Sequence, residues 1–184
     1  MSLRRKKTFV VYKEAQKVGA YDERPMLPDH IHLQVYLSRN DHPQPFWLIC
    51  EKDTMLVCFA GTGRVAFQDT GIRWFPFEPG DHVYVPAGAP TRLLPDSETV
   101  VLRYKAQNPG LEGVAWYCEG CGLELYRHVF DTADTVAHRG YVDGTQAFNA
   151  DSELRTCTRC AAVHPEVDLG RYRWEQLAAD LAEG

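Results

Sequence analysis

The sequence predicts an all-β fold, a sandwich or a barrel of short strands, followed by a metal-binding tail. Short runs rich in β-branched and aromatic residues recur between residues 30 and 105, and turn residues such as Pro79-Gly80-Asp81 separate them. Several short strands at this spacing are typical of sandwiches and barrels. Two CxxC pairs, Cys118/Cys121 and Cys157/Cys160, follow the strand region and predict the tail.

The elements before and within the strand region are expected in this order. Residues 8–28 mix Lys, Glu, Ala and Val and end in Arg24-Pro25-Met26-Leu27-Pro28, which predicts a short helix and then an extended lead-in. Seven strands are then expected, at residues 30–37, 46–50, 55–59, 64–67, 72–77, 82–85 and 99–104.

The second half of the chain is expected to contain loops and a terminal helix in place of regular strands. Residues 106–165 are expected to be rich in loops, and they contain both cysteine pairs. Trp174, Leu177 and Leu181 recur at helical spacing, so residues 172–182 are expected to form an amphipathic helix. We therefore expect a barrel with a helical lead-in at residues 1–107, and a metal-binding tail with a terminal helix at residues 108–184.

Composition limits the classes of partner. The chain has 184 residues, 45% of them hydrophobic, and a net charge of −5, which gives no basic footprint for nucleic acid. The apolar runs at residues 46–50 and 55–60 are too short to span a bilayer, and the basic start is not followed by a signal segment. We expect a cytoplasmic protein with neither a nucleic-acid nor a membrane partner.

The four cysteines predict a metal site. In a reducing compartment cysteines rarely form disulfides, and two CxxC pairs can close a tetrahedral thiolate site around one Zn or Fe ion. Disulfide pairing is the alternative. A four-thiolate site has no open coordination position, so we expect it to be structural and to fix the tail against the barrel. Electron transfer is a second role open to iron.

Two stretches of sequence carry a resemblance to a known family. Residues 77–90, Phe-Glu-Pro-Gly-Asp-His-Val-Tyr-Val-Pro-Ala-Gly-Ala-Pro, resemble the second signature motif of cupins. Residues 113–121, together with Arg155-Thr156-Cys157-Thr158-Arg159-Cys160 and Val163-His164-Pro165, resemble the C-terminal part of bacterial 3-hydroxyanthranilate 3,4-dioxygenases. The resemblance covers roughly residues 20–165. It implies a double-stranded β-helix, or jelly-roll barrel, with a rubredoxin-like metal site appended.

The resemblance also implies that the family's catalytic iron site is lost. Family members hold Fe(II) with two His and one Glu, and the matching positions here are Leu48, Thr54 and Thr91. A leucine and two threonines do not supply the imidazoles and carboxylate of such a site. No catalytic iron is therefore expected in the barrel.

The family's substrate-binding and catalytic residues are replaced as well. Gln44 and Pro95 stand where the resemblance places substrate-binding arginines, although Arg92 lies nearby, and the catalytic glutamate falls on Arg103. If the barrel still holds a small molecule, the residues expected to bind it are Gln44, Leu48, Thr54, Thr91, Arg92 and Arg103. A collapsed, purely structural barrel is the alternative.

Arg103 is the most informative of these positions. On a strand of the expected register its side chain points inward, and a buried guanidinium needs an anionic partner. That partner is either a carboxylate of a ligand or an acidic residue of the chain such as Glu51 or Asp53.

The remaining catalytic candidates are thiols and imidazoles. Cys50 and Cys58 share strand parity with inward positions, so each is either an inert buried thiol or a nucleophile. His30 and His32 fall on one side of an expected strand. They are half-exposed side chains, a general acid or base, or part of a relocated metal site with His42 or His82. We take Arg103, His32 and Cys58 as the catalytic candidates.

Three functions follow from these residues and the resemblance. The first, which we favour by family analogy, is an enzyme that carries out a metal-independent transformation of a small aromatic or amino-aromatic carboxylic acid. The second is a non-catalytic metabolite-binding or accessory protein, and the third is a ring-cleaving dioxygenase with relocated metal ligands. The resemblance implies a homodimer, because family members often dimerise through their barrels.

Overall fold

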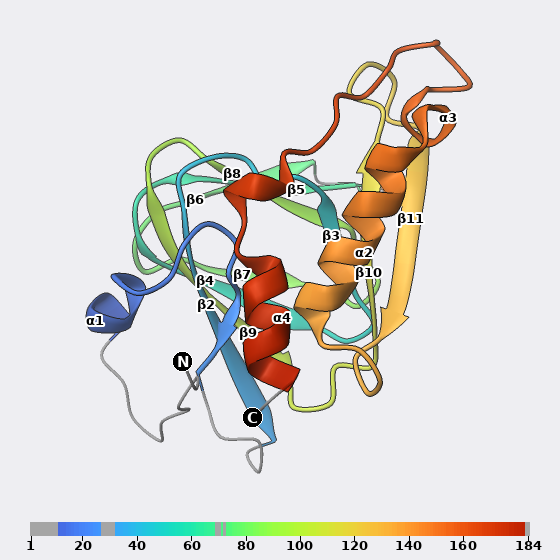
Figure 1. The fold of residues 1–184 in the computed structure, drawn as a ribbon. Helices are drawn as coiled ribbons and strands as arrows, with labels where there is room; N and C mark the ends of the chain where they lie inside the picture. The colour runs from blue at the N-terminus through green and yellow to red at the C-terminus, as the bar shows by residue number, and fades with distance from the viewer. Residues whose placement is uncertain (1–10, 27–31, 69–70, 72, 183–184) are drawn as a thin grey trace.

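The computed structural model describes residues 11–26, 32–68, 71 and 73–182, and its core is two antiparallel β-sheets that face each other (Figure 1). The first sheet has the order β1-β2-β9-β4-β7 and the second has the order β11-β10-β3-β8-β5-β6. The strands are β1 (Arg24–Pro25), β2 (Leu33–Asn40), β3 (Trp47–Cys50), β4 (Thr54–Ala60), β5 (Gly63–Phe67), β6 (Trp74–Phe77), β7 (His82–Val85), β8 (Thr91–Pro95), β9 (Thr99–Ala106), β10 (Leu111–Tyr117) and β11 (Glu124–Asp131).

Strand alternation explains why the two sheets enclose one core. On β9, Val101 packs in the core between the sheets, whereas Val100 and Leu102 pack with Val18 and other residues on the outer face of the first sheet. Side chains two residues apart on a strand share a face. Arg103 and Lys105 therefore point inward with Val101. This jelly-roll order of strands confirms the expected cupin-type all-β fold.

The helices are α1 (Val11–Ala15), α2 (Ala137–Ala150), α3 (Ser152–Arg155) and α4 (Trp174–Ala182), with a short 3-10 helix, η1 (Leu169–Arg171). The expected N-terminal and C-terminal helices are confirmed as α1 and α4. In Figure 1, α2 and α4 lie side by side and α2 runs along β10 and β11. Among the described residues, no helix is long and apolar enough to cross a membrane.

The expectation of a loop-rich segment at residues 106–165 is wrong, because this segment forms β10, β11, α2 and α3. Glycine hides α2 in the sequence, since it is a poor helix former. A Cβ on Gly140 would lie 2.4 Å from the Phe130 ring, and one on Gly144 would lie 2.7 Å from Val114. These glycines allow the helix to approach the sheet, and helix propensity alone cannot show that.

Two smaller corrections concern the strands. β2 begins at Leu33, so His32 precedes the strand instead of lying within it, and His30 falls outside the described residues. β8 was not expected, because Pro90 and Pro95 bracket it and resemble turn residues. It pairs with β5 along its whole length and with β3 at Leu48.

The second sheet contains strands from both sides of the domain boundary expected between residues 107 and 108. β10 pairs antiparallel with β3 of the barrel, so that Val114 lies opposite Leu48 and Glu112 opposite Cys50. β10 also pairs with β11. The segment that carries the first cysteine pair is thus a direct extension of a barrel sheet.

Candidate functional site: a four-cysteine centre and a buried charge cluster

The four cysteines converge as the spacing predicts. Cys118 Sγ lies 3.4 Å from Cys160 Sγ, Cys121 Sγ lies 3.5 Å from Cys157 Sγ, and all four sulfurs lie within 4.8 Å of one another. A tetrahedron with Zn–S bonds of 2.3 Å has S···S edges of about 3.8 Å. The distances are too long for disulfides, which need about 2.05 Å. The site fits a single tetrahedral metal ion.

The two knuckles share one backbone design. Gly122 N donates to Cys118 O at 2.8 Å, and Ala161 N donates to Cys157 O at 2.9 Å. The residue after each second cysteine has a positive φ, 74° at Gly122 and 59° at Ala161. That conformation favours glycine, so the second knuckle contains strain that the first avoids.

The four-cysteine centre joins two parts of the chain that are distant in sequence. Its first pair lies at the tip of the β10–β11 hairpin and its second pair in the turn after α3, both at the end of the molecule where α3 projects in Figure 1. Arg92 of β8 donates to Glu119 inside the first knuckle at 2.6 Å. The centre is thereby linked to the barrel.

Inside the barrel, two of the three positions that the resemblance assigns to iron ligands are neighbours on paired strands. Leu48 and Thr91 are paired across β3 and β8, and Thr91 Oγ1 donates to Leu48 O at 3.4 Å. Thr54 begins β4, and its buried Oγ1 has no partner among the described residues. Among the described residues, the four cysteines form the only group of three or more His, Cys, Asp or Glu side chains able to hold one ion.

Gln44 and Arg92, two of the expected ligand-binding residues, serve internal contacts. Gln44 is buried, and its Oε1 accepts from Leu93 N at 3.2 Å. Arg92 Nε donates to Gln44 O at 2.7 Å while its Nη1 binds Glu119. Both side chains therefore connect β8 to neighbouring segments of the chain.

Arg103 is buried and pairs with an acidic residue, but the acid is Glu23 and neither of the two expected. Arg103 Nε donates to Glu23 Oε1 at 3.2 Å. Glu51 instead accepts from Leu111 N, and Asp53 accepts from Ala87 N at 2.8 Å. Glu23 lies 80 residues away in sequence, so strand spacing could not have indicated it.

Arg103 and Glu23 belong to a larger set that we call the interior charge cluster: Glu23, Arg103, Lys105, Glu112 and Tyr141. Lys105 Nζ lies 2.9 Å from Glu112 Oε1 and 3.5 Å from Glu23 Oε2. Tyr141 OH donates to Glu23 Oε2 at 3.1 Å. Two cations and two carboxylates balance in a region that excludes water, which is the arrangement that buried charges require.

The electrostatics of the interior charge cluster keep it ionised. Burial alone raises the pKa of the Glu23 carboxyl, but the nearby Lys105 and Arg103 outweigh it and lower that pKa to about 2. Burial alone lowers the pKa of Lys105, yet Glu112, Tyr141 and Glu23 hold it well above its ordinary value.

The backbone is strained where it delivers Glu23. Glu23 has φ 39° and Tyr21 has φ 52°, values that side-chain-bearing residues rarely adopt. The strained segment is held by Trp174 Nε1, which donates to Tyr21 O at 3.0 Å, and by His138 Nε2, which contacts Asp22 O. Residues from α2 and α4 therefore fix the carboxylate between Arg103 and Lys105.

One group of the interior charge cluster is incompletely satisfied. Arg103 Nη1 and Nη2 are buried and have no hydrogen-bond partner among the described residues, although the residue is only 2% exposed. Each unsatisfied buried donor costs about 1–3 kcal/mol. Two adjacent donors of this kind match the two oxygens of a carboxylate.

The catalytic candidates from the sequence are not brought together. Cys58 lies opposite Val101 on β9, whereas His32 precedes Leu33, which lies opposite Ala106. Cys58 and His32 are therefore about six residues apart along the strand direction, which is about 20 Å at 3.3 Å per residue. Arg103 lies between them, and His32 is exposed.

Both interior thiols are protonated at neutral pH. Burial raises the pKa of Cys50 to about 12 and that of Cys58 to about 11. The Cys58 thiol also donates to Ala60 O at 3.4 Å. Neither thiol has the lowered pKa of a nucleophilic cysteine.

Three hollows bear on ligand binding. The cavity between Leu56, Val65 and Val101 inside the barrel is about 10 Å³, which is about the size that one water needs. A polar groove of about 170 Å³ lies beside the interior charge cluster and is lined by Glu112 and His138. A third, apolar cleft of about 760 Å³ opens between the edge strands β6 and β7.

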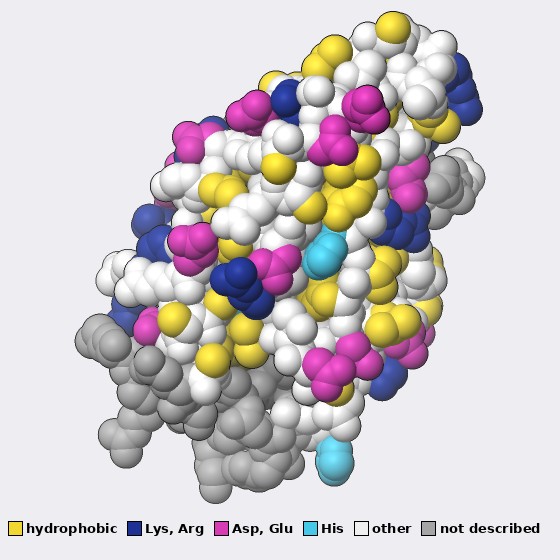
Figure 2. Space-filling view, turned by 45° about the vertical axis from the view of Figure 1, so that its right-hand side comes forward, with side chains coloured by type: hydrophobic (Ala, Val, Ile, Leu, Met, Phe, Trp, Pro, Cys, Tyr) yellow, Lys and Arg dark blue, Asp and Glu magenta, His cyan; other side chains and the backbone are white. Residues whose placement is uncertain are grey.

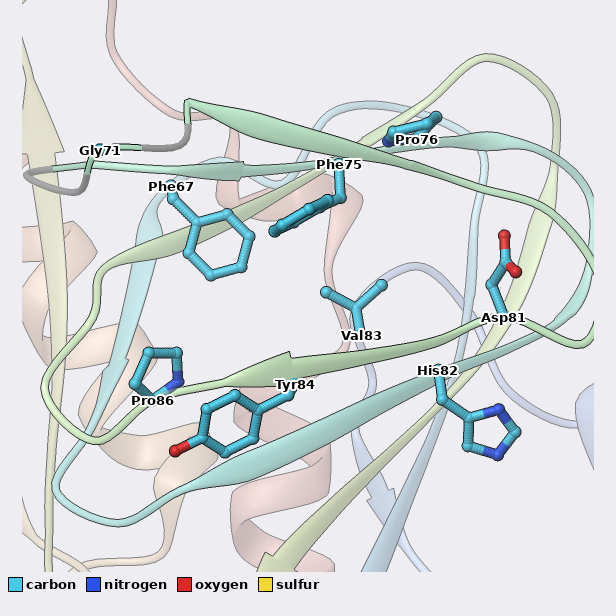
Figure 3. A pocket seen from close by; sticks show the side chains of 9 residues that line it. All are labelled: Phe67, Gly71, Phe75, Pro76, Asp81, His82, Val83, Tyr84 and Pro86. Carbon is cyan, nitrogen blue, oxygen red and sulfur yellow. The ribbon is translucent and has the colours of Figure 1, made fainter.

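Figure 3 shows the apolar cleft from close by. Val83 points toward the rings of Phe67 and Phe75, while His82 points away. The two rings pack edge to face, with their centroids 5.7 Å apart. The face in Figure 2 carries acidic and basic side chains that are interspersed among apolar ones, rather than one basic stripe.

Most of the interior charge cluster was missed in the sequence. Lys105 follows Arg103 by two residues, and Glu112 alternates with the buried Val114 and Trp116, so strand parity could have indicated both. Tyr141 could not be found this way because α2 itself was not expected.

Comparison with known proteins places the chain in two steps. The two antiparallel sheets and their strand order define a jelly-roll barrel of the cupin type. Within that class it is similar to the 3-hydroxyanthranilate 3,4-dioxygenases of Bacillus thuringiensis (26% identity over 98 residues, 52% of this chain and 53% of the relative) and Ruegeria pomeroyi (30% over 93 residues, 49% and 51%). The enzyme of that name from Jannaschia sp. is 29% identical over 129 residues, 68% of this chain and 66% of the relative.

The chain spans about half the length of the first two relatives, and no family model matches it. Solved structures similar to it include a cupin-2 domain protein from Shewanella frigidimarina (TM-score 0.41, 15% identity, 47% of this chain and 81% of that one). Another is the hydroquinone 1,2-dioxygenase from Sphingomonas sp. TTNP3 (TM-score 0.46, 11% identity, 56% and 82%).

Proposed function

We propose that this chain is a 3-hydroxyanthranilate dioxygenase-like cupin that recognises a small aromatic or amino-aromatic acid without iron in its barrel. The observation that carries the proposal is the pair of buried, unpartnered nitrogens on Arg103. None of the three hollows described above is lined by Arg103, so the interior would have to open before a ligand carboxylate could accept from both nitrogens and remove the cost of leaving them unsatisfied. The curated relatives are named for 3-hydroxyanthranilate, an amino-aromatic acid, which supports this class of ligand.

The absence of an iron role for the barrel rests on residue chemistry. Leu48 has no donor atom in its side chain, and the hydroxyls of Thr54 and Thr91 replace a carboxylate and an imidazole. The four cysteines would hold the Zn or Fe ion of the protein, and in that closed site the ion would stabilise the fold. The chain would then use one metal, for structure.

The buried groups of the barrel support ligand binding without catalysis more than they support an enzymatic reaction. Cys50 and Cys58 are held protonated by burial, and Glu23 is held ionised by its cationic neighbours. A general acid or base works best with a pKa near the operating pH, and these groups are far from it. A metabolite-binding or accessory role therefore has more support than a metal-independent transformation.

We also propose a cytoplasmic homodimer. Large apolar side chains are exposed at the edges of the two sheets, with Trp74 at 51% and Tyr84 at 54%. Contiguous exposed apolar surface is typical of a protein interface. Size-exclusion chromatography with light scattering would test this, and a monomer at all concentrations would contradict it.

Calorimetry tests ligand recognition. Wild-type protein with its metal content measured is titrated with 3-hydroxyanthranilate and anthranilate, and the same titration is made with Arg103→Lys and with the surface control Arg139→Lys. Lysine keeps the charge but lacks the paired donors, so Arg103→Lys should bind at least about tenfold more weakly. No binding by the wild type, or equal binding by Arg103→Lys, would contradict the proposal, while product formation would show a transformation.

A further inference from the structure

The polar groove beside the interior charge cluster has the size of a small ligand site. It lies where the end of the barrel meets the first turn of α2, and its volume is about 170 Å³. A cavity of roughly 150 Å³ is enough to hold benzene. Its walls combine apolar residues such as Pro109 and Leu181 with a few polar side chains, as ligand pockets do.

His138, at the first turn of α2, gives the groove a defined chemistry. Its Nε2 contacts the carbonyl oxygen of Asp22, and because a carbonyl only accepts, Nε2 carries the proton. Burial lowers the pKa of His138, so the ring is neutral. Nδ1 is then an acceptor, and it has no partner among the described residues although His138 is 1% exposed.

Two further acceptors belong to residues that line the groove. Gln107 Oε1 is buried and without a partner among the described residues, and the Glu112 carboxylate also lines the groove. Lys105 lies 2.9 Å from Glu112 and would repel an ammonium ion there. The groove therefore suits a neutral group that donates hydrogen bonds.

We propose that this groove binds a neutral single-ring molecule through an aromatic amino group, which donates to His138 Nδ1 and Gln107 Oε1. The ring would occupy the apolar part of the groove, near Pro109 and Leu181. The site is independent of the function proposed above, because it needs no carboxylate and Arg103 does not line it.

Two probes of the same shape isolate the hydrogen bonds. Aniline and toluene differ mainly in the N–H donors, so their relative affinity for the full-length protein, measured by NMR titration, reports on the acceptors. Wild-type protein should prefer aniline by about 5- to 10-fold, the worth of one or two net hydrogen bonds. His138→Leu and Gln107→Leu should each reduce that preference, whereas His82→Ala, at an exposed position of β7, should not.

The outcomes separate the alternatives. Equal affinity for aniline and toluene, or no binding of either because the groove holds only a water, would overturn the proposal. Shifts at Phe75 and Val83 with none at His138 would place the probe in the apolar cleft and also overturn it. Gln107→Leu, at a partly exposed site, keeps the test decisive if His138→Leu does not fold. Calorimetry with anthranilate and Arg103→Lys reports on the other function separately.

Discussion

The four-cysteine centre and the interior charge cluster are both polar sites assembled from distant parts of the chain, but they differ in how the sequence encodes them. The centre is encoded by two local motifs, and each CxxC pair forms a knuckle closed by its own backbone hydrogen bond. The interior charge cluster takes its five residues from an N-terminal segment, two strands and a helix, and β9 supplies two of them. It exists only once the whole barrel has closed.

The two sites also stabilise the protein in different ways. The centre joins the β10–β11 hairpin to the turn after α3, so a metal ion bound there would cross-link two segments that are distant in sequence. The interior charge cluster balances charges within a packed core, where losing one partner leaves another uncompensated. The following variants test this difference, from the largest expected effect to the smallest.

Cys118→Ser should have the largest effect. A structural zinc site contributes on the order of 10 kcal/mol in small domains, and the barrel here retains its own core, so we expect the tail to lose roughly 5 kcal/mol or more of local stability. Mass spectrometry should show no bound metal, and hydrogen exchange should rise in residues 117–124 and 155–163 first. Cys58→Ser, inside the barrel, is the control and should keep the metal. Unchanged exchange in the tail would show that the metal does not act as the cross-link.

Lys105→Met should cost about 3–5 kcal/mol in the free energy of unfolding, because it leaves two buried carboxylates with one cation. The double variant Lys105→Met/Glu112→Met removes the pair together and should recover much of that loss. Chemical denaturation measures both. If the single variant were as stable as the double variant, the two residues would not be coupled.

Acid should expose the contribution of Glu23. Its pKa is lowered from 4.5 to about 2 in the folded protein, so the stabilisation is present above about pH 4.5 and is lost as the pH falls toward 2. The shift corresponds to about 3 kcal/mol. Glu23→Gln should therefore flatten the pH dependence of stability between pH 5 and 2. A wild-type curve that is already flat there would contradict the role assigned to Glu23.

The strain in the second knuckle should give the smallest effect. Ala161→Gly should stabilise the metal-bound protein by about 1 kcal/mol, since glycine adopts positive φ without penalty. Gly122→Ala should have the opposite sign in the first knuckle. Thermal melts of both variants with metal bound would measure the pair, and a destabilised Ala161→Gly would show that the two knuckles are not equivalent.

This comparison also explains what could be predicted from sequence. The all-β barrel and the four-cysteine cluster follow from periodicity and spacing, which are local signals, and the cupin type follows from the family resemblance; the fold and the cluster are confirmed. The inward direction of Arg103 also follows from strand parity. Its partner Glu23 does not, because the pairing depends on a strained turn that Trp174 and His138 fix from the other end of the chain.

The α2 helix shows the same limit at the level of secondary structure. Its glycines lower the helix propensity of the segment. They allow close packing against Phe130 and Val114, and this packing cannot be read from the sequence of the helix alone. Tyr141 and His138 both lie on this helix. The polar groove and part of the interior charge cluster were therefore hidden together with it.

Iron reconstitution tests most directly the central proposal, that the four cysteines and not the barrel hold the metal ion of this chain. Wild-type and Cys118→Ser proteins are loaded with Fe(II) under anaerobic conditions, desalted and analysed for iron per chain. The account predicts one ion in the wild type and none in Cys118→Ser. Iron retained by the Cys118→Ser protein, or two ions in the wild type, would contradict it, because the barrel would then still bind a metal.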